Sequence, residues 1–236
     1  MGDSDTITCE ILNVITQTHD VKTFTLDPER DVDFVPGQFS VFSIPDDEEH
    51  EDAEKPFTFA NSPVSGRLEI TVKEVGDFTT ALHSLESGDR LEMSEPFGSP
   101  LEFNEDVEED VVFLAGGSGI TPFMSALRYS MDKNLGNDIT VIYSNKTQKD
   151  IIYREDLERL AQTSENIDVF HTLTREEPDG WDGETGRIDE DMVEKYVDNI
   201  QDKLWYVCGP MDMAKAMEDM LSDMGVPGEK IKTEEW

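Results

Sequence analysis

Residues 111–122 read VVFLAGGSGITP, and this stretch decides the fold of the second half of the chain. Its apolar run, 111–115, is typical of a strand that is buried on both faces of a parallel sheet. The glycines that follow permit a tight turn and a close approach of the backbone to a ligand, and Pro122 suits the first turn of a helix. We therefore expect a strand, a glycine-rich turn and a helix whose N-terminus offers free N–H groups to a phosphate. A tight connection that binds nothing is the alternative.

From this turn onward, strand patterns alternate with helix patterns. This alternation predicts a doubly wound (Rossmann-like) α/β domain, which we place at residues 107–236. The domain boundary falls inside an acidic linker at 102–110. The expected strands are 111–115, 139–143, 167–173 and 204–207, and the expected helices are 121–133, 153–163, 189–199 and 211–224.

The sequence before the linker consists of short segments rich in Val, Ile, Phe and Thr, separated by glycine and proline turns. One short helix, expected at 79–85, interrupts them. Strands of this kind with turns at short intervals predict an antiparallel β-barrel domain over residues 1–106. The expected strands are 7–16, 21–26, 38–44, 57–60, 67–74 and 90–94.

The chain is very acidic, with 54 Asp and Glu against 19 Lys and Arg, a formal net charge of −35 and a pI of about 4.1. Such a potential repels nucleic acid and anionic membranes, so we expect neither as a partner. Two origins of the acidity stay open. One is a surface for a basic partner, and the other is adaptation to a salt-rich (halophilic) cytoplasm, where repulsion is screened within about 3 Å at 1 M. The acidic residues are spread along the whole chain, which favours the second.

The only cysteines, Cys9 and Cys208, are too few for a disulfide framework, a four-thiolate zinc site or an iron–sulfur cluster. We therefore expect a reducing compartment and no metal. No apolar run approaches the roughly 18 residues of a membrane span, and the acidic start lacks the cationic region of a signal peptide. The sequence predicts a cytoplasmic protein.

Three further motifs accompany the glycine-rich turn. Residues 55–60, KPFTFA, combine the three groups that a flavin needs: a cation for its phosphate, an aromatic ring for the isoalloxazine and a hydroxyl near N5. An ordinary core strand is the alternative. Residues 76–82, GDFTTAL, form a turn into a helix, either to bind phosphate or because Thr79 caps the helix. Residues 208–210, CGP, end the last expected strand at the carboxyl edge of the sheet.

Together with EPFG at 95–98, these motifs occur in an order that resembles the ferredoxin–NADP reductase superfamily. The resemblance covers nearly the whole chain and implies a flavin-binding barrel followed by a nicotinamide-nucleotide domain. It implies hydride transfer between NAD(P)H and bound FAD, and single-electron transfer to an acceptor, with ferredoxin or another small electron carrier expected. The helix start at 76–80 suits the pyrophosphate of FAD better than FMN. A non-catalytic electron-transfer subunit and an acidic binding module without flavin are the alternatives.

The resemblance also implies individual roles. Lys55 would contact flavin phosphate, Phe57 would pack on the isoalloxazine, and Thr58 would bond near N5, while Cys208 would lie near the nicotinamide; Thr58 and Cys208 are the catalytic candidates. The family commonly has Arg and Tyr where this chain has Lys55 and Phe57, and lysine offers only a point charge to the phosphate. The other implied contacts are Pro56, Gly76, Phe78, Thr79 and Thr80 for FAD, and Gly117, Ser118, Gly119, Thr121, Pro122, Gly209 and Pro210 for the nucleotide.

Two further expectations concern the nucleotide and the chain's end. The second α/β strand ends in 143–146, YSNK, without the carboxylate that often holds the ribose of NAD. Arg175, in 173–175, LTR, resembles the family's 2′-phosphate contact, so NADPH is favoured over NADH, with Lys146 as a second contact; ordinary solvated cations are the alternative. Trp236 is expected to stack on the flavin, as a terminal aromatic does in the family, unless it is a loose or surface-bound tail.

Overall fold

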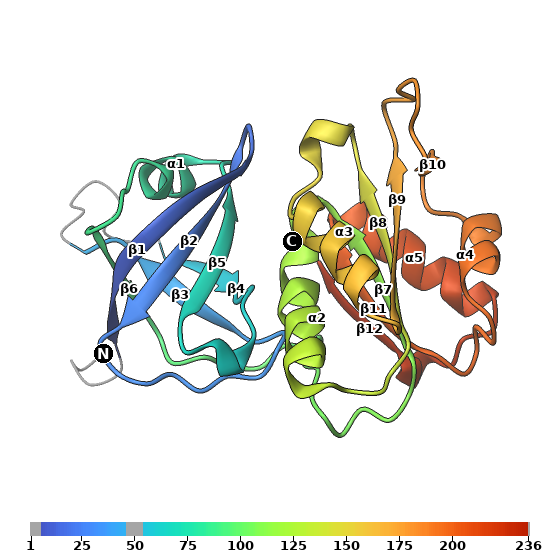
Figure 1. The fold of residues 1–236 in the computed structure, drawn as a ribbon, viewed down its shortest axis with the longest axis horizontal. Coiled ribbons are helices and arrows are strands. Elements are labelled where there is room, and N and C mark those ends of the chain that lie inside the picture. The colour runs from blue at the N-terminus through green and yellow to red at the C-terminus, as the bar shows by residue number, and fades with distance from the viewer. Residues whose placement is uncertain (1–5, 46–53, 236) are drawn as a thin grey trace.

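The computed structural model describes residues 6–45 and 54–235 of the chain. It contains a β part built by the first half of the sequence and an α/β part built by the second (Figure 1). This confirms the order of the two predicted domains.

The first part is an antiparallel sheet of six strands in the order β4-β3-β6-β1-β2-β5. Its two edge strands meet through a bridge between Phe59 and Ile70, which closes the sheet into the predicted barrel. Alternate apolar side chains point inward and form a core that includes the fully buried Ile11, Phe24 and Phe42. The strands are β1 (Ile7–Thr18), β2 (Val21–Pro28), β3 (Phe39–Ser43), β4 (Lys55–Thr58), β5 (Leu68–Lys73) and β6 (Arg90–Met93), accompanied by η1 (Pro63–Ser65) and α1 (Asp77–His83).

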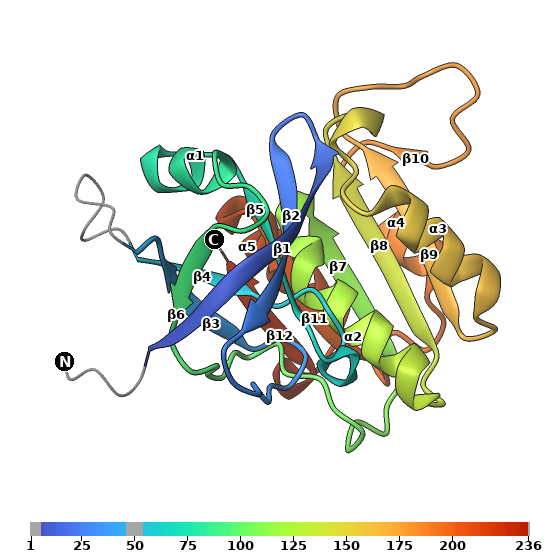
Figure 2. The same cartoon turned by 60° about the vertical axis from the view of Figure 1, so that its left-hand side comes forward.

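The second part is a parallel six-stranded sheet in the order β10-β9-β8-β7-β11-β12. Two helices, α2 (Thr121–Lys133) and α3 (Arg154–Thr163), pack on one face, and α4 (Glu190–Tyr196) and α5 (Met211–Asp223) pack on the other (Figure 2). The strands are β7 (Val111–Gly116), β8 (Ile139–Asn145), β9 (Ile167–Leu173), β10 (Glu184–Thr185), β11 (Leu204–Gly209) and β12 (Ile231–Glu235), with the short helices η2 (Gly117–Ile120), η3 (Gln148–Asp150) and η4 (Gly228–Lys230).

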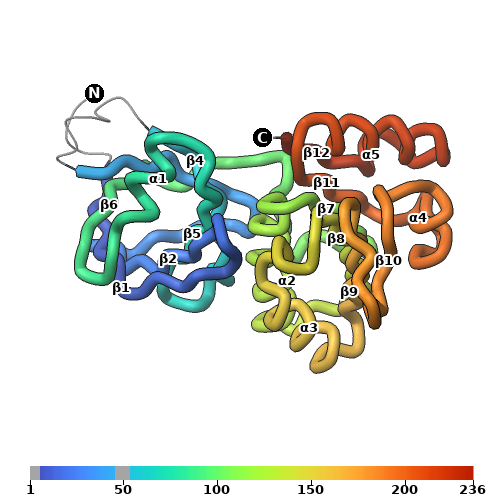
Figure 3. Tube along the Cα trace, turned by 90° about the horizontal axis from the view of Figure 1, so that it is seen from above, coloured from blue at the N-terminus to red at the C-terminus, as the bar shows by residue number. Residues whose placement is uncertain are grey.

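The strand order reverses at β7, because β8 lies on one side of it and β11 on the other. In open α/β sheets, ligands bind outside the carboxyl ends of the strands at such a reversal. The glycine-rich turn follows β7 and Cys208 lies near the end of β11, so both predicted nucleotide motifs lie at this point. Figure 3 shows the described chain ending beside the barrel.

Several boundaries differ from the predicted ones. Strand β4 lies two residues earlier than expected, because Lys55 and Pro56 already pair with β3, whereas Phe59 and Ala60 contact β5. Helix α1 begins at Asp77 and ends at His83, and α4 ends at Tyr196, before the expected 199. Strands β10 and β12 were not predicted. In the described part of the chain, no helix combines the length and the apolar character needed to cross a bilayer.

Candidate active site

The glycine-rich turn forms an open cradle at the end of β7. Gly117 has φ 55, in the left-handed region that favours glycine, and no described residue other than its chain neighbours has an atom within 4 Å of the position a Cβ would take. Thr121 at the start of α2 donates a hydrogen bond from Oγ1 to the Ser118 carbonyl at 2.8 Å, and Pro122, the next residue of the helix, is buried. The turn and the α2 N-terminus therefore suit a phosphate or pyrophosphate group.

Gly119, in the same turn, is needed for a different reason. A Cβ on Gly119 would lie 2.2 Å from the Cys208 carbonyl oxygen, so the turn packs directly against the end of β11. The Gly209 Cβ position would lie 3.3 Å from the Gly116 Cα. The structure thus brings the two predicted nucleotide motifs into backbone contact.

The Cys208 thiol lies at this junction and is 4% exposed. Burial, together with the negative charge of Glu234, raises the pKa of the Cys208 thiol well above its usual range. The side chain therefore stays a neutral thiol at physiological pH, which suits a packing contact with a bound ring and not a nucleophile.

The predicted flavin motifs lie together on the barrel. On β4, Lys55 is exposed, whereas Phe57 and Thr58 are half-buried. The Phe57 ring stacks on Phe78 of α1, with ring centroids 6.3 Å apart and an interplanar angle of 17°. This contact places the strand motif beside the helix start at Gly76.

The helix start uses its two threonines differently. Thr79 Oγ1 accepts hydrogen bonds from the Val75 and Gly76 N–H groups at 2.9 and 3.0 Å and donates to the Gly76 carbonyl at 2.9 Å. Its hydroxyl is therefore occupied in holding the turn, as in the capping alternative. Thr80 is exposed and donates to Glu74 at 3.0 Å. Among the described residues, none beyond the chain neighbours of Gly76 lies within 4 Å of the position that a Cβ on Gly76 would take.

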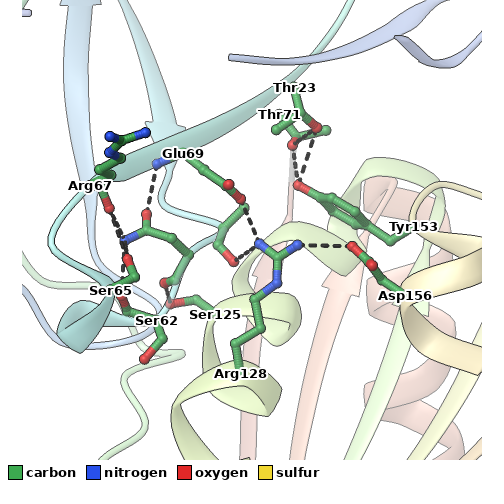
Figure 4. A network of polar contacts seen from close by, with 12 residues as sticks. Thr23, Ser62, Ser65, Arg67, Glu69, Thr71, Ser125, Arg128, Tyr153 and Asp156 are labelled. Carbon is green, nitrogen blue, oxygen red and sulfur yellow. Dashed lines mark hydrogen bonds and ion pairs between the residues drawn. The ribbon is translucent and has the colours of Figure 1, made fainter. Parts of the chain in front are cut away.

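Helix α2 joins the flavin strand to the glycine-rich turn. Immediately beyond β4, the Asn61 carbonyl accepts from Ser125 Oγ at 2.7 Å, and the Ala60 carbonyl accepts from Arg128 Nη1 at 2.9 Å. Ser125 and Arg128 both lie on α2, the helix that begins after the glycine-rich turn (Figure 4). The two predicted cofactor motifs are thus fixed to the same helix.

Comparisons with known proteins agree with this geometry. Residues 8–101 match the oxidoreductase FAD-binding domain, and residues 113–219 match the oxidoreductase NAD-binding domain. Sulfhydrogenase 1 subunit gamma of Pyrococcus furiosus is 30% identical over 232 residues, which cover 94% of this chain and 76% of that protein. The chain belongs to the ferredoxin–NADP reductase superfamily. Its predicted family and its FAD and NAD(P) cofactors are thereby confirmed.

Two more similarities were found, one in sequence and one in fold. The glycine betaine monooxygenase reductase subunit of Pseudomonas aeruginosa is 31% identical over 223 residues, covering 91% of this chain and 60% of that protein. In fold, the chain matches a ferredoxin NADP⁺ reductase from Neisseria gonorrhoeae, solved with bound FAD and NADP, with a TM-score of 0.84 and 20% identity over 99% of both chains. The chain spans 40%, 54% and 60% of three curated relatives, about half of their length.

Arg175 and Lys146 lie side by side. They are the two cations predicted to select the nucleotide in this superfamily member. The Arg175 N–H donates to the Lys146 carbonyl at 3.0 Å, and the Thr174 N–H donates to the Asn145 carbonyl at 2.9 Å. Both Arg175 and Lys146 are exposed. They therefore form a basic pair at the carboxyl edge of the sheet, in a chain that is otherwise acidic.

The carboxyl end of this superfamily member also reaches the site. Glu235 pairs with Gly209, and Glu234 accepts a hydrogen bond from Ser99 Oγ at 2.5 Å. Trp236 lies outside the described residues, so its predicted stacking on the flavin stays a prediction.

Sequence reasoning missed the residues that join the two domains of this superfamily member. Ser125, Arg128 and Tyr153 contact the barrel from α2 and from the connection before α3. Each is a single polar residue within an otherwise ordinary helical pattern, which gives no local signal of a partner in another domain.

Proposed function

We propose that the protein transfers a hydride between NAD(P)H and bound FAD and passes single electrons to a small carrier such as ferredoxin. When bound, FAD supplies the ring that accepts the hydride and releases the electrons one at a time. The observation that carries the proposal is the attachment of the flavin strand to α2, because this helix also begins at the nucleotide cradle. Both cofactors then belong to one crevice.

On the barrel side, the chain's residues bind and orient the flavin. The exposed Lys55 ammonium pairs with flavin phosphate, and Phe57, supported by Phe78, packs on the ring. The Thr58 hydroxyl donates near N5. At the helix start, backbone N–H groups hold the pyrophosphate, and the exposed Thr80 hydroxyl joins them when it turns from Glu74 to the phosphate, while Thr79 keeps the turn in shape.

On the α/β side, the residues hold the nicotinamide nucleotide and exclude water. The open cradle at Gly117 and the α2 N-terminus receive the pyrophosphate, and Ser118 and Thr121 line it. Cys208 to Pro210 pack beside the nicotinamide. Because the Cys208 thiol is buried and neutral, it helps to exclude water from the reacting atoms and does not attack the nicotinamide as a thiolate would. No acid–base side chain is required for this step.

The purified protein tests this proposal directly. It should be yellow with oxidised flavin, and NADPH or NADH added without oxygen should bleach that absorbance. A later addition of an oxidised ferredoxin should restore the colour. A colourless protein, or a yellow one that neither nucleotide bleaches, would refute the proposed hydride transfer.

A second candidate function is an electron-transfer subunit that works only within a larger complex. Both curated relatives named above are subunits, and the chain spans 60% of one and 76% of the other. Rapid turnover of the isolated protein with NADPH and a soluble carrier supports a free-standing reductase. Bleaching by the nucleotide without turnover on any soluble carrier supports the subunit.

Both cysteines are buried and free, which fits the cytoplasm as the compartment of the protein.

We expect Arg175→Ala to raise the KM for NADPH about 10- to 100-fold and to leave the KM for NADH unchanged. A charge-assisted hydrogen bond to the 2′-phosphate is worth about 1.5–3 kcal/mol, and only NADPH carries that group. Steady-state kinetics with both nucleotides measure the ratio. Arg90→Ala is the matched control, because Arg90 is an exposed arginine on β6 of the barrel, to which no role in nucleotide binding is assigned. Equal kinetics for the two nucleotides in the parent and in Arg175→Ala would mean that Arg175 is an ordinary solvated cation.

Deletion of Trp236 should increase flavin fluorescence and tighten binding of the nicotinamide nucleotide about two- to tenfold. Stacking of the Trp236 side chain on the flavin would be worth roughly 0.5–1.5 kcal/mol. The nicotinamide must overcome this free energy to reach the isoalloxazine. Fluorescence and equilibrium titration with NADP⁺ measure both effects, and Trp236→Tyr is the control that keeps a stacking ring. A deletion variant with unchanged fluorescence and affinity would leave Trp236 as a surface residue.

A further inference from the structure

The connection between β8 and α3 holds a buried tyrosine in an unfavourable backbone conformation. Tyr153 has φ 58 and ψ 27, in the left-handed region that residues with a Cβ rarely adopt, and its side chain is almost completely buried. Such conformations persist where the surroundings hold them in place, and they often occur at functional sites. The contacts of Tyr153 therefore indicate what this conformation achieves.

The side chain of Tyr153 reaches into the barrel. Its hydroxyl shares a hydrogen bond with Thr71 of β5 and accepts a longer one, at 3.5 Å, from Thr23 of β2 (Figure 4). The Tyr153 N–H donates to Gln17 Oε1 on β1 at 3.3 Å. Arg128 lies over the Tyr153 ring, 5.2 Å from its centre. One residue of the α/β part thus contacts three strands of the flavin domain.

Arg128 reinforces the same junction with charge. Its guanidinium contacts Glu69 of the barrel at 2.6 Å and Asp156 of α3 at 3.0 Å. Arg128 lies against the Tyr153 ring from α2, and the three residues of the hydroxyl contacts, Thr23, Thr71 and Tyr153, are all buried. Polar contacts of this kind fix one geometry, because an unpaired buried hydroxyl or carboxylate is costly.

A chain of hydrogen bonds continues from this junction to the glycine-rich turn. The Ile152 N–H, next to Tyr153, donates to the Tyr143 hydroxyl at 3.4 Å. The Tyr143 hydroxyl in turn donates to the Gly117 carbonyl at 2.8 Å. Tyr143 and Ile152 are both buried. The barrel is therefore linked through residues 152–153 to the residue that shapes the nucleotide cradle.

We propose that Tyr153 is a positioning residue that sets the glycine-rich turn at a fixed distance from the flavin strand. This inference rests on the proposed hydride transfer, which needs reacting atoms about 3–3.5 Å apart. A small shift of the turn relative to the barrel changes that distance while leaving each cofactor's own contacts in place. Loss of the Tyr153 hydroxyl should therefore slow hydride transfer more than it weakens binding of either cofactor.

The test compares Tyr153→Phe, Thr71→Val and the double variant with the parent protein. We expect each single variant to slow flavin reduction by saturating NADPH about tenfold, as expected for the loss of a hydrogen bond worth about 1.4 kcal/mol. The Kd for NADP⁺ should change less than about threefold, and flavin content should stay unchanged. The long-wavelength absorbance produced by nicotinamide stacked on the flavin should weaken. The double variant should be much less slow than the product of the two single losses, because both substitutions remove the Tyr153–Thr71 contact, although Thr71→Val also removes the Thr71–Thr23 hydrogen bond.

Tyr196→Phe is the matched control, because the Tyr196 hydroxyl binds Glu184 within the α/β part. It should leave the rate and the long-wavelength absorbance as in the parent. Parent-like values in Tyr153→Phe, or additive losses in the double variant, would overturn the proposal.

Amide hydrogen exchange separates this proposal from the proposed function. Without any nucleotide, Tyr153→Phe and Thr71→Val should both speed exchange in residues 117–120, and Tyr196→Phe should not. If NAD(P)H does not reduce the parent protein, hydride transfer fails, but the exchange result still decides whether Tyr153 holds the turn. Unchanged exchange at 117–120 in both variants would refute the positioning role.

Discussion

Replacement of Gly119 by alanine will weaken binding of the nicotinamide nucleotide about 100-fold while the barrel still binds FAD. The added Cβ would lie 2.2 Å from the Cys208 oxygen, 2.5 Å from the Cys208 carbonyl carbon and 2.9 Å from the Gly209 nitrogen. All three are backbone atoms at the end of a buried strand, so the turn itself has to move. Overpacking typically costs about 1–3 kcal/mol, and the upper end corresponds to about 100-fold in an equilibrium constant.

Two other glycines serve as controls for this prediction. Gly136 is exposed, and within the described structure a Cβ there would meet open space, so Gly136→Ala should match the parent. In Gly117→Ala the added Cβ also has room, but the residue must keep a positive φ, which costs about 1 kcal/mol. Nucleotide affinity should therefore fall about fivefold, between the values for the other two variants. Titration with NADP⁺ and the ratio of flavin to protein measure these effects. Nucleotide affinity in Gly119→Ala equal to that in Gly136→Ala would contradict the packing argument.

The sequence predicted most accurately those segments whose signals are local. Helix α2 spans the expected 121–133, because the glycine-rich turn and Pro122 mark its start and Asn134 ends it with φ 51. Strand β9 also has the expected bounds. The flavin and nucleotide motifs belong to the same class, since each is a short run of residues that acts as a unit.

Edge strands were missed because their stability comes from a neighbour and not from their own composition. Strand β12 reads IKTEE, with a single strongly apolar residue, and it pairs only with β11 among the described strands. Strand β10 has two residues, Glu184 and Thr185, and pairs with β9. Neither run shows the alternation or the apolar content from which a strand is predicted.

The joining of the two domains was equally hidden. Ser125 and Asn61 are 64 residues apart in sequence, and Tyr153 and Thr71 are 82 apart. A serine or an arginine on a helix reads as a solvated residue until the fold supplies its partner. The sequence therefore predicts which residues hold each cofactor, whereas the structure was needed to find the contacts that join the two predicted cofactor motifs.

Raising KCl from low to molar concentration will increase the midpoint of thermal unfolding by about 10 °C. With 54 acidic and 19 basic residues, most carboxylates have no cation available to them, and the compact state suffers self-repulsion that salt screens. Like-charge neighbours cost a few tenths of a kcal/mol each, so relief of about ten such contacts is worth about 3–5 kcal/mol, or about 10 °C in a protein of this size.

Asp219 and Asp223 are an exposed pair at i,i+4 on α5. The double variant Asp219→Asn, Asp223→Asn should therefore be more stable than the parent at low salt and should gain less stability from KCl. Circular dichroism melts across the salt series measure both. A midpoint that does not change with KCl would show that self-repulsion is not limiting, and it would favour a surface for a basic partner as the origin of the acidity.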